Sequence, residues 1–170
     1  WWGKASEADI LKRLHGQYGD RAGPLLAAAK AGWPKDHPSY LYTDITSKGP
    51  FVTSAVLAER KAAQPAPVYM YVWEWGAPAD GGMMRSPHTL EIPFVFDNVE
   101  RGPLLRGTAA STRALAKQAS SACTAFARTG NPNAAGLPAW PRYEPTRRAT
   151  MVFNTRIRVE NDLYAEFRTP

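Results

Sequence analysis

Histidine is the side chain best suited to move protons near neutral pH, and this chain has three of them. His15 lies on the polar side of a predicted amphipathic helix and His37 in a proline-containing loop, so a surface role and a turn role are expected for them. His88 differs, because it stands in the segment RSPHTLEIPFVF (85–96), on a loop that follows a predicted buried strand. Such loops collect the ligand-binding and catalytic groups of open α/β sheets. His88 is therefore the candidate proton carrier; the alternative is a hydrogen-bonded histidine that closes the loop.

The other residue types that do chemistry form no recognisable site. The GxSxG motif presents a nucleophilic serine on a strained turn, but the only glycines four residues apart, Gly19 and Gly23, enclose Arg21. The chain has no His-x-x-x-His or Cys-x-x-Cys pair and no glycine-rich phosphate loop, so we expect neither a metal nor a cofactor. The single cysteine, Cys123, falls among small residues in a predicted helix, where it is expected to be buried and inert.

The composition indicates a folded chain with enough hydrophobic residues for the core of one domain. Of its 170 residues 44% are hydrophobic and six are Trp, unlike a disordered chain. The net charge of +6 comes mostly from scattered arginines, and the longest basic run is Arg147–Arg148, so we expect no nucleic-acid partner. No stretch approaches the roughly 20 apolar residues of a membrane span. No secretory signal is visible, but the chain lacks an initiator Met and its natural N-terminus is expected to be missing. The localisation therefore stays open, and an extracytoplasmic or secreted protein is compatible with the sequence.

Hydrophobic periodicity and capping residues predict four helices. The first begins after the N-cap Ser6, with Asp9 three residues on, and stops at Gly19. The prolines of WPKDHPSY (33–40) predict a loop. The other three helices are predicted at 23–32, 50–64 and roughly 108–129.

Two strands are predicted, and they do not make a complete sheet. PVYMYVWEW (67–75) carries β-branched and aromatic residues on both faces, as in a strand that is covered on both sides. Its aromatic residues are interpreted as core, the alternative being a carbohydrate-binding or nucleic-acid-binding platform. ATMVFN (149–154) is the second strand, and the residues after it are expected to form a short tail. Because two strands cannot bury both faces of the first, we expect the missing strands in another segment, upstream.

Four segments of the chain occur in an order that is familiar from one enzyme family. They are YTDITSKGPFVTSAVLAERKAAQPAPVYMY (42–71), PVYMYVWEW with SPHTLEIPFVFDNV (67–99), FARTGNPN with LPAWPRYEP (126–145) and RRATMVFN (147–154). Together they resemble type-B carboxylesterases, the carboxylesterase/lipase group of the α/β-hydrolase fold that includes cholinesterases and bacterial p-nitrobenzyl-esterase-like enzymes. One departure is Cys123–Thr124–Ala125, where the family usually carries a tryptophan. This departure is expected to affect helix packing rather than chemistry.

The resemblance implies an α/β fold class: the C-terminal part of an α/β-hydrolase fold, with few strands, several helices and a central sheet that is incomplete in this chain. Residues 1–170 would be a single C-terminal segment of one domain, and the absent N-terminal portion would carry the nucleophilic serine and the triad acid. The implied activity is carboxylic-ester hydrolysis by a Ser-Glu-His triad through an acyl-enzyme. This chain would supply His88 and be inactive alone. The implied partners are that N-terminal portion and a small-molecule ester substrate.

The resemblance also suggests roles for residues near His88. Glu91 is expected to support the loop through hydrogen bonds rather than to transfer a proton. Trp75, Met83 and Met84 are expected to border the acyl or alcohol pocket. Asp80 is a further candidate to orient His88, which the family pattern does not support.

Two alternatives remain open at this point. The first is a non-catalytic relative of the esterases that acts in binding or adhesion, and an upstream segment with an intact GxSxG motif would argue against it. The second is a freestanding, aromatic-rich binding domain that only mimics the family pattern. Cooperative unfolding of a monomeric 170-residue chain would favour this second alternative.

Overall fold

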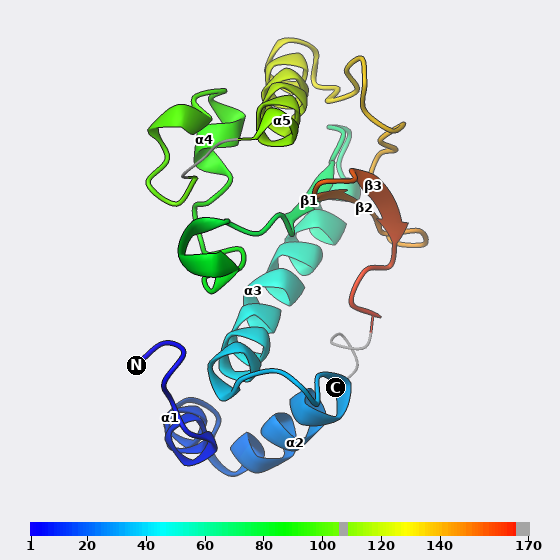
Figure 1. Ribbon diagram of the computed structural model, residues 1–170. Coiled ribbons are helices and arrows are strands. Elements are labelled where there is room, and N and C mark those ends of the chain that lie inside the picture. Colours follow the sequence, from blue (N-terminus) through cyan, green and yellow to red (C-terminus); the bar gives the residue numbers. More distant parts are fainter. Residues whose placement is uncertain (106–108, 166–170) are drawn as a thin grey trace. The chain divides into compact units, whose positions relative to one another are not determined.

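The computed structural model describes residues 1–105 and 109–165, and its backbone is shown in Figure 1. The chain divides into two compact units, Trp1–Ser54 and the part that begins at Ala55. The division falls inside one long helix, α3 (Pro38–Ala62). Each unit has its own core of buried hydrophobic residues.

The first unit is helical. It contains α1 (Glu7–Tyr18), a 3₁₀ turn η1 (Gly19–Arg21), α2 (Ala22–Gly32) and the beginning of α3. The predicted capping box of α1 is confirmed: the Ser6 Oγ accepts the Asp9 N–H at 3.2 Å, and the Asp9 carboxylate accepts the Ser6 N–H at 2.9 Å. Leu14 of α1 and Leu26 of α2 lie in one buried cluster, so apolar residues at helical spacing hold this unit together.

Helix α3 begins twelve residues earlier than the sequence indicated. The predicted loop 33–40 ends in the helix, because Pro38 occupies its first turn, where a missing N–H costs nothing. His37 precedes the helix, and its Nδ1 accepts the Ser39 N–H at 3.2 Å. Pro50, predicted to start the helix, instead lies inside it. The Ser54 hydroxyl donates to the Pro50 carbonyl at 2.9 Å, the bond that serine side chains inside helices make to the carbonyl four residues before them.

The second unit is built on one three-stranded sheet with the order β1-β2-β3. Strand β1 (Met70–Trp73) runs parallel to β2 (Ala149–Phe153), and β3 (Arg158–Asn161) runs antiparallel to β2. Both predicted strands are confirmed, β1 as a shorter element. The prediction of a plain tail after β2 was wrong, because part of that tail pairs with β2 as β3. Every residue of β2 is buried, as expected for the middle strand.

Strand β1 forms one edge of this sheet among the residues that the structure describes. Its odd-numbered residues face helix α5 (Ala110–Thr129), since Tyr69 packs against Phe126 with ring centroids 6.0 Å apart. Tyr71 on the same face is 46% exposed. The two-sided cover predicted for this strand is therefore incomplete in the described chain.

Short helical turns and one long helix surround the sheet. They are η2 (Ala79–Gly82), α4 (Ile92–Val95), η3 (Val99–Arg101) and α5. Figure 1 shows α4 and α5 side by side, and the two helices are in contact. The Arg148 guanidinium bonds the Glu59 carboxylate at 2.8 Å, which joins the last turns of α3 to the start of β2.

Helix α5 presents one narrow apolar stripe to the core. The predicted starting residue, Thr108, lies outside the described residues, and the helix ends as predicted at Thr129, with Gly130 in the left-handed region (φ 72°). Cys123 lies at the margin of the stripe and is exposed, so the prediction of a buried cysteine was wrong. Only one face of a surface helix is covered, and small neighbours do not reveal which face that is. The buried residues of the stripe are Thr112, Leu115, Ala116, Ala119 and Ala122.

Candidate active site

His88 is carried by a loop that leaves and rejoins the carboxyl end of β1. At the start of the loop, the N–H groups of Glu74 and Trp75 donate to the Phe153 carbonyl of β2, at 2.9 and 3.1 Å. At its end, the Ser86 hydroxyl donates to the carbonyl of Trp73, the last residue of β1, at 3.1 Å. The loop is therefore fixed to the sheet at both of its ends, and His88 follows the second attachment by two residues.

A second contact closes the loop behind its tip. The Ala77 N–H donates to the Arg85 carbonyl at 2.7 Å, and Ala77 is buried. Gly76 lies close to the Arg85 backbone, since a Cβ there would meet the Arg85 carbonyl oxygen at 3.7 Å. The segment between these contacts contains Asp80 in the left-handed region (φ 53°). Because the Ala77–Arg85 bond closes the loop before Ser86, a change in the conformation of the loop tip need not move His88.

His88 begins a tight turn and is exposed. The Leu90 N–H donates to the Pro87 carbonyl at 3.1 Å, and the Leu90 side chain is buried in the core of this unit. Thr89 has a φ of 72°, a conformation that β-branched residues rarely adopt. Residues in such regions persist where their surroundings impose the conformation, and they cluster at functional sites. Within the described part of the chain, no hydrogen bond joins the His88 imidazole to another residue.

Glu91 immediately precedes helix α4. Its backbone carbonyl accepts the N–H groups of Phe94 and Val95 at 3.0 and 2.9 Å, which connects the turn of His88 to the helix. The Glu91 side chain is half-buried and close enough to Tyr71 to act on it electrostatically. Burial raises the pKa of Tyr71, and the negative charge of Glu91 adds to the effect.

Phe94 anchors α4, and with it the turn of His88, to the end of β1. Its side chain is 0% exposed. Its ring centroid lies 4.7 Å from that of Trp73 and 4.9 Å from that of Trp75. Tilted aromatic pairs at such distances are favourable beyond their buried area. Trp73 at the end of β1 and Trp75 after it therefore act as core, as the sequence analysis favoured, and they fix the helix that comes after His88.

The residues expected to border a substrate pocket are distributed around this loop. Trp75 is buried against Phe94, Met83 is exposed, and Met84 is half-buried. Met83 and Met84 follow the 3₁₀ turn η2 at the tip of the loop. Asp80, in that turn, is exposed. These three residues do not line the apolar pocket that β1 forms with helix α5, so their role stays a prediction.

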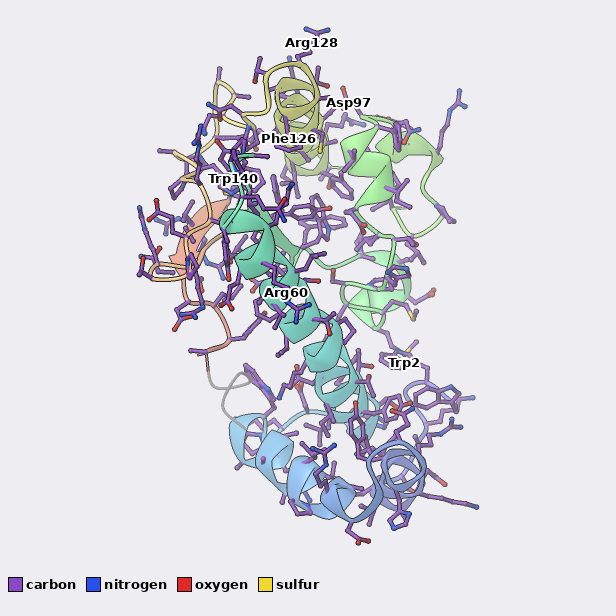
Figure 2. The ribbon with its side chains drawn as sticks, turned by 180° about the vertical axis from the view of Figure 1, so that it is seen from behind. Trp2, Arg60, Asp97, Phe126, Arg128 and Trp140 are labelled. Atoms are coloured by element: carbon purple, nitrogen blue, oxygen red, sulfur yellow. The ribbon has the colours of Figure 1, made fainter. Side chains whose placement is uncertain are left out.

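An apolar pocket of about 200 Å³ lies between β1, α5 and the loop that follows α5. Phe126 and Trp140, labelled in Figure 2, both pack against Tyr69, with ring centroids 6.0 Å from its ring. Cys123 is one of the lining residues, and partial burial raises the pKa of its thiol. The sequence signal for the pocket was the alternation of aromatic residues along β1, for which core packing was favoured over a binding platform. The lining residues are Tyr69, Tyr71, Trp73, Val95, Ala119, Ala122, Cys123, Phe126, Pro132, Trp140 and Phe153.

A charged network, which the sequence analysis missed, lies at the carboxyl end of β1, where the loop of His88 begins. The Glu74 carboxylate accepts hydrogen bonds from Arg158 at 3.0 Å and from the Tyr164 hydroxyl at 3.2 Å. Arg158 also bonds Glu160, its neighbour two residues along β3. These bonds raise the pKa of Arg158, the one to Glu160 most. The described residues contain no group of three or more His, Cys, Asp or Glu that would hold a metal ion.

Comparison with known proteins identifies the family of this chain. A sequence model described as the Carboxylesterase family matches residues 27–168, which is most of the chain. The chain belongs to the carboxylesterase family. This result confirms the resemblance of the four ordered segments, and it excludes the interpretation of a domain that only mimics the pattern.

Individual carboxylesterases and related hydrolases match over much of the chain. The para-nitrobenzyl esterase of Bacillus subtilis is 37% identical over 151 residues, which cover 85% of this chain and 29% of that protein. The phenmedipham hydrolase of Pseudarthrobacter oxydans is 30% identical over 156 residues, covering 88% of this chain and 31% of that hydrolase.

A solved carboxylesterase structure shows the same fold. The crystal structure of a Geobacillus stearothermophilus carboxylesterase at pH 6.2 superposes with a TM-score of 0.80 and 32% identity, over 98% of this chain and 35% of that one. The chain therefore has the α/β-hydrolase class of fold that was predicted, rich in helices and with few strands. It spans about a third of the length of these relatives. None of the described helices is both long and apolar enough to cross a lipid bilayer.

Proposed function

We propose that this chain is the C-terminal segment of a single α/β-hydrolase domain and supplies His88 as the general base of carboxylic-ester hydrolysis. The nucleophilic serine and the acid of a Ser-Glu-His triad come from an upstream portion of the same esterase. Members of the family are named esterases and carboxylesterases, and this supports ester hydrolysis as the reaction class. The assignment of the base rests on the residues around His88.

One observation carries the assignment: His88 sits at the carboxyl end of a parallel strand, on a loop fixed to that strand by hydrogen bonds. Catalytic groups of open α/β sheets gather at this end of the strands. His88 is exposed there, whereas the loop behind it is closed by backbone bonds. A general base needs a fixed backbone and an accessible ring, and both conditions are met.

In the proposed reaction, a ring nitrogen of His88 accepts the proton of the serine hydroxyl as the serine oxygen attacks the ester carbonyl carbon. The imidazolium then gives this proton to the departing alcohol oxygen, and the acyl group stays on the serine. Water attacks the acyl-enzyme in the same way. His88 takes a proton from that water and returns it to the serine oxygen as the carboxylic acid leaves. The residues of this chain need no metal and no cofactor for these steps.

The upstream portion joins the sheet at the free edge of β1. This strand has one described neighbour, and an edge strand presents unpaired N–H and C=O groups to another strand. Tyr71 leaves part of its ring exposed beside that edge. A further strand parallel to β1 would continue the sheet past it and bring its own carboxyl end near His88.

Around His88, we assign supporting roles to four residues. Glu91 stabilises the turn through its carbonyl bonds to the start of α4. Trp75, Met83 and Met84 border the acyl or alcohol pocket once the upstream portion is present. They differ in exposure, and the buried Trp75 would act as the fixed wall while the exposed Met83 adapts.

The test is p-nitrophenyl acetate turnover by the complete esterase that carries this chain, with His88 changed to Ala or Gln. We expect kcat to fall by about a thousandfold or more, because a serine without its base is a poor nucleophile. His15→Ala is the matched control, since His15 is an exposed helix residue of the other unit, and it should leave kcat unchanged. Turnover that survives in both His88 variants would contradict the proposal.

A further inference from the structure

The carbonyl of Trp73 points toward the free edge of β1. The Glu74 N–H donates to Phe153 of β2, so it points toward β2. The Trp73 carbonyl belongs to the same peptide group, and in a planar trans peptide the C=O and the N–H point in opposite directions. The carbonyl that accepts the Ser86 hydroxyl therefore faces away from β2, on the side where β1 has no neighbouring strand among the described residues.

Ser86 consequently brings the chain back to β1 on the side away from β2, two residues before His88. Pro87 separates the two residues, and its ring fixes φ near −65°, so little freedom remains between the hydroxyl and the histidine. The second closing contact joins Ala77 to Arg85, and both residues precede Ser86 in the sequence, whereas His88 follows it. It holds the loop tip together but does not by itself join the histidine to the strand.

We propose that Ser86 is a positioning residue for His88: its hydroxyl bond to the Trp73 carbonyl fixes the histidine backbone at the open edge of β1. This inference rests on the proposed function of His88. The bond occupies the last carbonyl of β1 on its open edge, so it also marks where pairing with an upstream strand ends. Without it, the strand end and the histidine turn remain joined through covalent geometry and through the packing of Leu90 and Phe94 in the core.

The test compares Ser86→Ala, Ser86→Thr and Ser54→Ala in the complete esterase with p-nitrophenyl acetate. Active sites are counted by titration with an organophosphate that reacts with the serine, so that a loss of folded protein is separated from a loss of rate. Ser54→Ala is the matched control, because it removes a hydroxyl bonded to a backbone carbonyl at 2.9 Å in α3, far along the chain from His88. Ser86→Thr keeps the hydroxyl.

For Ser86→Ala we expect kcat per titrated site to fall about fivefold, with KM changed by less than about twofold, as for the loss of one hydrogen bond that orients a catalytic group. Ser86→Thr should recover most of the rate, and Ser54→Ala should match the parent enzyme. An unchanged kcat per site in Ser86→Ala would overturn the inference, as would a loss that appears only as fewer titratable sites or that Ser86→Thr does not restore.

The two proposals fail in different ways. If His88→Ala abolishes turnover but Ser86→Ala does not change it, only the positioning role is wrong. If His88→Ala leaves turnover intact, the function proposed for His88 is wrong, and the role of Ser86 falls with it.

Discussion

Phe94 provides the sharpest test of how the turn of His88 is held. Its ring is 0% exposed and lies between Trp73 and Trp75, at centroid distances of 4.7 and 4.9 Å. Changing Phe94 to Ala removes a buried ring and leaves a cavity, which costs about 4 kcal/mol of unfolding free energy. Phe96, two residues on, is 71% exposed. The same change at Phe96 should cost no more than about 0.5 kcal/mol.

The assay is urea unfolding of the complete esterase that carries this chain, followed by tryptophan fluorescence, to which Trp73 and Trp75 contribute. With a slope of about 2 kcal/mol per molar urea, Phe94→Ala should lower the midpoint by about 2 M, and Phe96→Ala should leave it within about 0.3 M. If Phe94→Ala is too unstable to show a folded baseline, Phe94→Leu should still lower the midpoint measurably. Equal midpoints for the Phe94 and Phe96 variants would refute the reasoning.

Two further predictions concern titrating groups. Hydrogen bonds from the Ser6 side chain and backbone lower the pKa of Asp9, so Ser6→Ala should raise that pKa toward its ordinary value in an NMR titration; an unchanged Asp9 curve would contradict the capping box. Burial raises the pKa of Tyr71 above 10.0, so the folded chain holds the phenol proton more tightly than the unfolded chain does. Stability should therefore be lost as the pH rises from 10 through the folded pKa, and urea midpoints for Tyr71→Phe should decline less. Parallel declines for the two proteins would show that Tyr71 is not the group responsible.

The sequence predicted best where the local signal and the tertiary structure agree. The Ser6 capping box sets the start of α1 by itself, and the apolar β-branched run of β2 suits a strand buried on both faces. Helix α3 was mispredicted because proline was interpreted as a breaker. Pro38 fits a first turn, and Pro50 is tolerated inside a helix of 25 residues.

The remaining errors came from contacts that no local pattern reveals. Strand β3 is short and carries polar residues, so it forms only because β2 offers it an edge. Cys123 was misjudged because the side of α5 that is covered depends on which elements pack against it. For the site, the sequence singled out His88 and its neighbours in sequence, and their catalytic roles stay a proposal. The bond between Ser86 and Trp73 joins residues thirteen apart, and only the structure brings them together.

The central claim is that this chain contributes the histidine, and not the nucleophile, of an esterase. The most direct measurement is p-nitrophenyl acetate turnover by the isolated 170-residue chain beside that of the complete esterase, each with His88 intact and with His88→Ala. We predict no enzymatic turnover by the isolated chain, and turnover by the complete enzyme that His88→Ala abolishes. Rapid turnover by the isolated chain that depends on His88 would contradict the account, because the nucleophile would then lie within these residues.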